Sequence, residues 1–428
     1  MNWLKRWRGE KMGKPKIRFK GYTEDWEQRK LNEVAEKICV GFVGTCEKFY
    51  TDESGVPMYR TGNLNGLSLN RDDLKYVTNE FHQHNQKSQL KAGDILIARH
   101  GDSGKAVNYE SSEEANCLNI VIIRPDFKKS NYKFLTNCIN SPECQKHIKS
   151  LSAGSTQAVI NTSEIEKLGV VMPTNIDEQN RIARYFSNLD NLITLHQRKC
   201  DETKKLKKCM LQKMFPKEGE KVPEIRFSGF AGDWKQRKLE EIVNRITRKN
   251  SKLISELPLT ISAQQGLIDQ NEFFDKRVAS KDVSGYYLIK NGEFAYNKST
   301  SNDAPWGAIK RLDRYENGVL STLYIVFEIK DETLVNSDFL VAYYSTNLWH
   351  KGIHEIAAEG ARNHGLLNIA PTDFFKTKLK LPADIEEQKE IGEYFKKIDL
   401  LITFHQQKCD ELKNIKKFML QNMFVSEK

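Results

Sequence analysis

The sequence predicts an α+β fold, in which two mixed α/β globules are separated by two long helices that pack against each other. Three observations predict this fold and its pseudo-two-fold internal repeat. Residues 173–215 recur at 382–424 without a gap, and 25 of the 43 positions are identical. A shorter stretch recurs at the start of each half, and the segments between the repeats differ from each other. A repeat at a fixed offset indicates a duplicated structural unit.

The composition indicates a soluble protein of two or three domains with a polyanionic partner. The 428 residues carry a net charge of +10, and 39% of them are hydrophobic. Residues 1–13 form a basic tail without the apolar core of a signal peptide, and no apolar run is long enough to cross a membrane. The eight cysteines form no CxxC pair and no metal-ligand spacing, so we expect reduced thiols, a cytoplasmic location and no bound metal.

The shorter repeat opens each globule. It reads IRFKGYTEDWEQRKL at 17–31 and IRFSGFAGDWKQRKL at 225–239. Because both copies keep Trp26 and Trp234, we interpret these side chains as packing anchors.

Variable stretches follow, and their short apolar runs indicate strands. These runs lie at 94–98, 118–123, 294–297 and 320–327. The predicted segments, in chain order, are a basic tail (1–13), the first globule (14–172), the first helix (173–215), a linker (216–224), the second globule (225–381) and the second helix (382–428).

Each copy of the long repeat predicts one helix. Proline and an acidic first turn precede a stretch that contains almost no helix breakers. Apolar residues recur about every seven positions, which is typical of a helix–helix seam. The predicted seam residues are Ile182, Leu189, His196, Met210, Ile391, Ile398, His405 and Met419, within a wider stripe that includes Leu192, Leu206, Leu401 and Ile415. His196 and His405 occupy equivalent positions. A packed, hydrogen-bonded pair is the plainer interpretation, and a proton switch is the alternative.

Catalytic motifs are not recognisable. The stretch 101–105 resembles a fragment of a phosphate-binding loop, but it lacks the first glycine and the final hydroxyl residue. There is no glycine-rich dinucleotide turn, no HExxH and no Asn-Pro-Pro-aromatic motif.

Polar and basic loops follow corresponding strands in the two globules, and both globules end on a second similar stretch. Arg, Lys, Asn, Gln and Ser side chains can contact base edges and phosphates in the major groove. For one such loop an ordinary solvated loop is the better explanation, but two loops in duplicated frames favour DNA contact. The predicted DNA-binding residues are Arg99, His100, Ser103, Lys105, Gln157, Asn161, Gln264, Asn297, Lys298, Ser299, Ser301, Arg362 and Asn363.

From Lys14 to Phe424 the chain resembles the specificity subunits of type I restriction–modification systems. The resemblance rests on the two-fold layout and on four motifs. These are IRFxGF…W (225–234), GDILIARHGDSGK (93–105), GEFAYNKS (292–299) and the helix start P…I…EQ…I…YF…LD…I…H.

This resemblance implies that each globule is a target-recognition domain, which reads one half of a bipartite double-stranded DNA target from the major groove. The helices would form an antiparallel coiled coil and offer docking sites to two methyltransferase subunits, which restriction and translocase subunits then join. S-adenosylmethionine, ATP and Mg²⁺ would belong to these partners, and this chain would be a non-catalytic subunit with no cofactor of its own.

Two alternatives remain. The chain could be the recognition part of a single-chain restriction enzyme–methyltransferase, although no segment is left to house the catalytic domain. It could also be a scaffold that joins two globules through a coiled coil without binding DNA.

Overall fold

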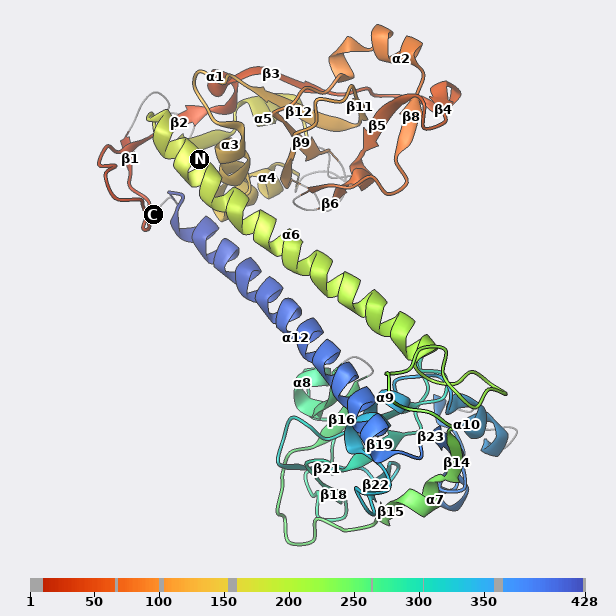
Figure 1. Cartoon of the computed structure of the whole chain (residues 1–428). Coiled ribbons are helices and arrows are strands. Elements are labelled where there is room, and N and C mark those ends of the chain that lie inside the picture. Colours follow the sequence, from red (N-terminus) through yellow and green to blue (C-terminus); the bar gives the residue numbers. More distant parts are fainter. Residues whose placement is uncertain are drawn as a thin grey trace. The chain divides into compact units, whose positions relative to one another are not determined.

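The computed structural model describes residues 11–65, 68–99, 104–152, 160–262, 265–302, 304–357 and 365–425. The chain divides into two compact units. Unit 1 comprises Met1–Gln197 with Gln407–Lys428, and unit 2 comprises Arg198–Gln406. Each unit holds one globule, the first part of one long helix and the last part of the other (Figure 1). The predicted α+β architecture with an internal repeat is therefore confirmed, while the finer segment boundaries stay predictions.

The two copies of the long repeat form helices α6 (Ile176–Lys213) and α12 (Ile385–Asn422), each of 38 residues. At 1.5 Å per residue each helix is roughly 57 Å long. Both begin behind a capping side chain, because Asn175 and Asp384 each accept the N–H two residues further on, at 2.8 and 2.9 Å. Within the described ranges, no helix combines the length and apolar composition that a membrane span requires.

The unit 1 globule is built around a four-stranded antiparallel sheet. Its described elements are β1 (Lys11–Gly13), β2 (Trp26–Lys30), α1 (Leu31–Val34), β3 (Ala35–Val40), β4 (Tyr50–Thr51), β5 (Val56–Arg60), β6 (Leu64–Asn65), β7 (Ser68–Leu69), β8 (Lys75–Val77), α2 (Asn79–His84), β9 (Asp94–Ala98), β10 (Ala106–Tyr109), β11 (Asn116–Leu118), β12 (Ile120–Pro125), α3 (Tyr132–Ile139), α4 (Pro142–Ser152), α5 (Thr162–Glu166) and β13 (Gly169–Met172). The sheet has the order β10-β9-β12-β3, with β9 and β12 in the centre. Two further sheets have the orders β11-β5-β8-β4 and β1-β2-β13.

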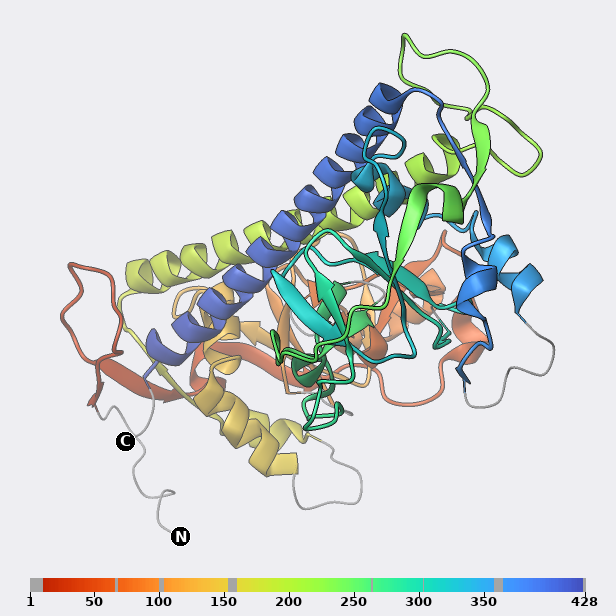
Figure 2. The same ribbon diagram turned by 90° about the horizontal axis from the view of Figure 1, so that it is seen from below.

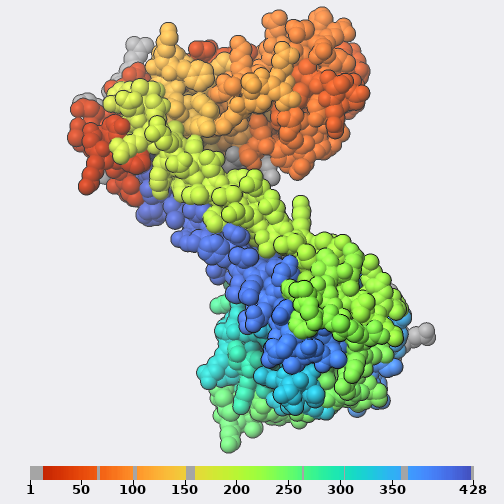
Figure 3. All heavy atoms as spheres, viewed as in Figure 1, coloured from red at the N-terminus to blue at the C-terminus, as the bar shows by residue number. Residues whose placement is uncertain are grey.

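The unit 2 globule repeats the central sheet. Its described elements are β14 (Lys235–Lys238), α7 (Leu239–Ile242), β15 (Val243–Ile246), β16 (Leu259–Ser262), β17 (Gly266–Asp269), α8 (Gln270–Phe274), β18 (Tyr287–Lys290), β19 (Phe294–Asn297), β20 (Ala308–Arg311), β21 (Asn317–Leu320), β22 (Ile325–Ile329), α9 (Ser337–Tyr343), α10 (His350–Ile356), α11 (Pro371–Phe374) and β23 (Lys378–Leu381). The order β20-β19-β22-β15 matches that of unit 1, and all neighbours are antiparallel. The green segment after α6 forms part of the surface of this unit beside the blue start of α12 (Figure 3).

Two of the predicted strands are in fact pairs of strands. The run 118–123 is divided at Asn119, whose φ of 54° lies in the left-handed region that Asn tolerates. The run 320–327 is divided by a turn in which the Tyr324 N–H donates to the Ser321 carbonyl at 3.1 Å. Apolar composition alone gives no sign of either bend.

An aromatic cluster joins each globule to both long helices. In unit 1 the Trp26 ring packs against Phe134 of α3 and against Phe424, which follows α12, with ring centroids 5.8 and 6.2 Å away. Phe186 of α6 contacts Phe424 at 5.9 Å. The corresponding cluster of unit 2 consists of Trp234, Phe339, Phe215 and Phe395. Both tryptophans are buried, as packing anchors must be.

The helices run antiparallel within unit 1. Asp190 of α6 bonds Lys416 of α12 at 2.5 Å, and seven residues further along α6 the Gln197 side chain contacts Cys409 at 3.5 Å. The end of α12 lies beside the start of the globule, where the Ile17 N–H donates to the Asn422 carbonyl at 2.9 Å (Figure 2).

The same pairing recurs within unit 2. Cys200 lies 3.8 Å from the Gln406 side chain, and further along α6 the Lys207 ammonium bonds Asp399 at 2.6 Å. Lys207 and Asp399 of this ion pair are equivalent to Lys416 and Asp190 of the pair in unit 1, at an offset of 209 positions. The sequence repeat is therefore accompanied by the same contacts in both units.

The predicted seam residues divide between the two units. In unit 1 the core includes Ile182, Leu189 and Met419, and in unit 2 it includes Ile391, Ile398 and Met210. His196 and His405 are half-buried.

The apolar stripe on the helices is wider than their seam. Leu192, Leu206, Leu401 and Ile415 are 43%, 45%, 51% and 37% exposed. The other helix therefore leaves these four residues of the wider stripe largely uncovered. An antiparallel helix pair covers only a narrow strip of each helix, and the sequence pattern does not reveal which side of a broad stripe stays open.

Candidate nucleic-acid interface

A half-buried arginine fastens the start of each globule to a long helix by binding a buried glutamate. In unit 1 the Arg18 Nε and Nη2 donate to the Glu178 carboxylate at 2.7 and 2.8 Å, and the Trp26 Nε1–H reaches the same carboxylate at 3.3 Å. This hydrogen bonding raises the pKa of the Arg18 guanidinium. Unit 2 repeats the arrangement at 2.6, 2.7 and 3.3 Å with Arg226, Glu387 and Trp234.

Glu178 and Glu387 belong to the acidic first turns of the two helices, where their negative charge is favourable. Their side chains are just 1% exposed, so their main role is to neutralise a half-buried arginine. A signal for this pair was present, because Arg18 and Glu178 both recur as identical residues in the second half.

In unit 1 the loop after β9 is anchored at both of its described ends. All of β9 is buried, and the half-buried Arg99 follows it. The Arg99 Nε donates to the Ile160 carbonyl at 3.3 Å, and the Ile160 N–H donates to the Arg99 carbonyl at 3.2 Å. At the other end, the Gly104 carbonyl accepts the Gln145 side chain of α4 at 2.6 Å. This leaves Lys105 exposed just before β10.

Asn161 is exposed next to this anchor, at the start of α5, where its N–H donates to the Glu164 carboxylate at 3.4 Å. The structure thus brings two predicted stretches together through Arg99 and Ile160. The predicted residues His100, Ser103 and Gln157 lie outside the described residues.

In unit 2 the loop after β19 begins with a side-chain turn. The Asn297 Oδ1 accepts the Ser299 N–H at 3.0 Å, a bond typical of asparagine in turns. The Ser301 N–H and carbonyl exchange hydrogen bonds with Ala304 at 3.1 Å. Asn297 is half-buried, whereas Ser299 and Ser301 are exposed.

Lys298 anchors this loop to the stretch before α11. Its carbonyl accepts the Leu367 N–H at 3.0 Å, and its ammonium donates to the Ile369 carbonyl at 3.4 Å. Burial lowers the pKa of Lys298. The remaining predicted residues of this unit, Gln264, Arg362 and Asn363, lie outside the described part of the chain.

The two units therefore hold the same pair of loops. In each, the residue after a central buried strand bonds the stretch that leads into a short helix, α5 or α11. Exposed amide, hydroxyl and ammonium groups gather there, and these groups can donate to base edges or phosphates. Across the described ranges, no three His, Cys, Asp or Glu residues are grouped so that they could hold a metal ion.

Two sequence relatives are specificity subunits of type I restriction enzymes. The specificity subunit of the putative type I restriction enzyme MjaX of Methanocaldococcus jannaschii is 28% identical over 200 residues, a match that covers 45% of this chain and 46% of the relative. The specificity subunit of the type I restriction enzyme EcoBI of Escherichia coli is 23% identical over 170 residues, covering 39% of this chain and 35% of the relative. Both matches span less than half of the relative's length.

Structural comparison shows the same fold in a solved protein. The crystal structure of the S subunit of a type I restriction–modification system from M. genitalium covers 97% of this chain and is itself covered completely, with a TM-score of 0.65 and 14% identity. The family described as "Type I restriction modification DNA specificity domain" matches residues 23–205 and 231–414. Because these two matches include well over half of the sequence, the chain belongs to the family of type I restriction modification DNA specificity domains.

Proposed function

We propose that the chain is the non-catalytic DNA-recognition subunit of a type I restriction–modification complex in the cytoplasm. Each globule reads one half of a bipartite double-stranded target from the major groove. One observation carries this proposal. The two globules have equivalent sheets with a pair of loops at the same places, but the loops contain different residues. Different polar side chains at equivalent positions would allow the two globules to bind half-sites of different sequence.

The exposed residues of the loops make the first contacts with DNA. These residues are Lys105 and Asn161 in unit 1, and Ser299 and Ser301 in unit 2. Lys298 is held by the Ile369 carbonyl in the free chain. A phosphate or base acceptor in its place would form a stronger, charge-assisted bond, so Lys298 turns outward when DNA binds.

The exposed part of the helix stripe docks two methyltransferase subunits. Leu192 and Leu401 are equivalent positions of the repeat, and so are Leu206 and Ile415. Exposed large apolar side chains at equivalent positions fit two copies of one partner. Restriction and translocase subunits join this core, and S-adenosylmethionine, ATP and Mg²⁺ bind to the partners.

The test is a gel-shift experiment with the purified chain, alone and with its methyltransferase. The target duplex is identified beforehand by mapping methylated bases in cells that carry both genes. We expect tight binding to this duplex and weak binding to a duplex in which both half-sites are scrambled. Equal affinity for the two duplexes would leave a scaffold without DNA specificity as the better explanation. A target that is methylated by this chain without any partner would indicate a single-chain enzyme.

A further inference from the structure

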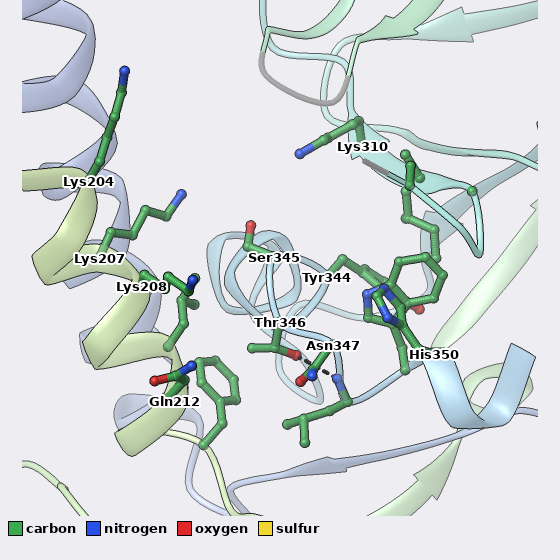
Figure 4. A pocket seen from close by; sticks show the side chains of 18 of the residues that line it. Lys204, Lys207, Lys208, Gln212, Lys310, Tyr344, Ser345, Thr346, Asn347 and His350 are labelled. Atoms are coloured by element: carbon green, nitrogen blue, oxygen red, sulfur yellow. Dashed lines mark hydrogen bonds between the residues drawn. The ribbon is translucent and has the colours of Figure 1, made fainter. Parts of the chain in front are cut away.

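Unit 2 contains a basic cavity that the DNA-binding loops do not explain. Its volume is about 780 Å³, and it lies between the last turns of α6, the strand β20 and the turn before α10. Lys204, Lys207 and Lys208 line it from α6, and Lys310 points into it from the opposite side (Figure 4).

Positive charge in this cavity is only partly neutralised. Lys207 is paired with Asp399, at 2.6 Å. Among the described residues, no carboxylate lies within ion-pairing distance of Lys204, Lys208 or Lys310, and none lines the cavity. Burial lowers the pKa of Lys310, and the nearby Lys207 lowers it further, while the Asp399 carboxylate raises it by a smaller amount. An anion in the cavity would relieve both effects.

The described cavity of unit 1 that a lysine of the repeat lines is less basic. The lysines repeat on α12 as Lys413, Lys416 and Lys417. Of these, Lys416 lines that cavity, where it is bonded to Asp190 at 2.5 Å. The other two cations of its wall, Arg71 and Lys133, are paired with Glu113 and Glu110. Of these two cavities, the one in unit 2 therefore has the excess of unpaired positive charge.

We propose that this cavity binds phosphates of the DNA backbone next to the half-site that unit 2 reads. The inference rests on the proposed function. Ala304 and Gly307 line the cavity, and they belong to the loop that begins at Asn297. A DNA strand on that loop therefore brings its backbone to the cavity mouth. The contacts are independent of sequence, because lysine neutralises phosphate without reading bases.

The experiment measures how the affinity for a target duplex depends on salt, with the full chain assembled with its methyltransferase. The test variant is Lys204→Gln with Lys208→Gln, and the matched control is Lys413→Gln with Lys417→Gln. All four lysines are exposed, and the two pairs are equivalent positions of the repeat, so both variants lose the same charge. Each lost phosphate contact reduces the slope of log affinity against log salt by ~0.9.

We expect the test variant to lose roughly 1.8 from this slope, with the methylated motif unchanged, and the control to lose much less. Lys204→Arg with Lys208→Arg should restore the slope. If the double glutamine variant does not fold, Lys310→Gln alone should lower the slope by about 0.9.

Three outcomes would overturn the proposal. Equal slopes in test and control variants would place no phosphate in the cavity. Loss of the methyltransferase from the test complex would assign the cavity to a protein partner. Binding of inorganic pyrophosphate that is lost in the test variant, with an unchanged DNA slope, would assign it to a free anion. In each case the wild-type complex still prefers its target duplex; without that preference, the proposed function itself fails.

Discussion

Asn297 shapes a loop and is also predicted to contact a base, and two substitutions separate these roles. In Asn297→Asp the carboxylate still accepts the Ser299 N–H, so the turn is kept, but the amide donor is lost. Asn297→Ala loses both. In each variant we expect the discrimination against altered bases to fall by roughly 1–3 kcal/mol in the half-site that unit 2 reads. Discrimination in the other half-site should not change. Competition binding with duplexes altered in one half-site measures this. Full discrimination by Asn297→Asp would mean that Asn297 only forms the turn.

Glu178 is expected to contribute strongly to the stability of unit 1. Glu178→Gln keeps the shape of the side chain but leaves the half-buried Arg18 without its countercharge. Such a loss costs about 3–5 kcal/mol when both partners are buried, and we expect less than this here because Arg18 is 11% exposed. We expect a clear fall in the midpoint of urea unfolding. The control is Glu393→Gln, which removes an exposed ion pair with Lys397 of the kind that contributes little. If both variants unfold at the same urea concentration, the pair of Arg18 and Glu178 does not have the role assigned to it.

At the scale of elements, the long helices could be predicted because a duplicated pattern of 43 residues is a strong signal. The strand β9 was also predictable, because the four consecutive apolar residues 95–98 stand out in the sequence. Strand ends set by a single backbone conformation, as at Asn119, could not be predicted. Nor could the bond between Arg99 and Ile160, since partners 61 positions apart leave no periodic trace.

The candidate site was also only partly predictable from the sequence. The sequence pointed to loops at matched places, but it did not show that Lys298 is bonded to the Ile369 carbonyl or that an asparagine turn shapes its neighbour. It also did not distinguish the covered side of the helix stripe from the open side, where Leu401 is 51% exposed. Side-chain direction depends on tertiary packing, which residue type alone does not specify.

Helix length is expected to set the number of base pairs between the half-sites. Four residues inserted after Arg198 and four after Gln407 would face each other in the antiparallel pair, because Gln197 contacts Cys409 and Cys200 contacts Gln406. The insertion adds roughly 6 Å and a net turn of about 40°. One base pair adds about 3.4 Å and turns DNA by about 36°. Rotation decides, because a globule turned to the wrong face of the DNA cannot enter the groove.

We therefore expect methylation of the same half-sites with a spacer one base pair longer. Mapping of methylated sites in cells measures this. Insertions of two residues serve as the control, because a turn of about 200° should abolish methylation. An unchanged spacer with full methylation would show that the helices do not determine the distance.

At the scale of the whole molecule, the repeat predicts that the chain tolerates circular permutation. The Ile225 N–H donates to the Lys213 carbonyl at 2.9 Å, which matches the bond between Ile17 and Asn422. A copy of residues 216–224 should therefore connect Phe424 to Ile17, with new termini opened after Glu218 in the exposed linker. We expect the permuted chain to specify the same methylated motif. A stable permuted chain that methylates a different motif would contradict the equivalence of the two halves.

The central claim is that the two globules read separate half-sites independently, and a domain exchange tests it most directly. Residues 240–381 are replaced by the corresponding stretch of another member of the family, and methylated sites are then mapped in cells that carry the hybrid and its methyltransferase. The account predicts a new sequence in one half of the motif, with the other half and the spacer unchanged. A change in both halves, or an unchanged motif, would contradict it.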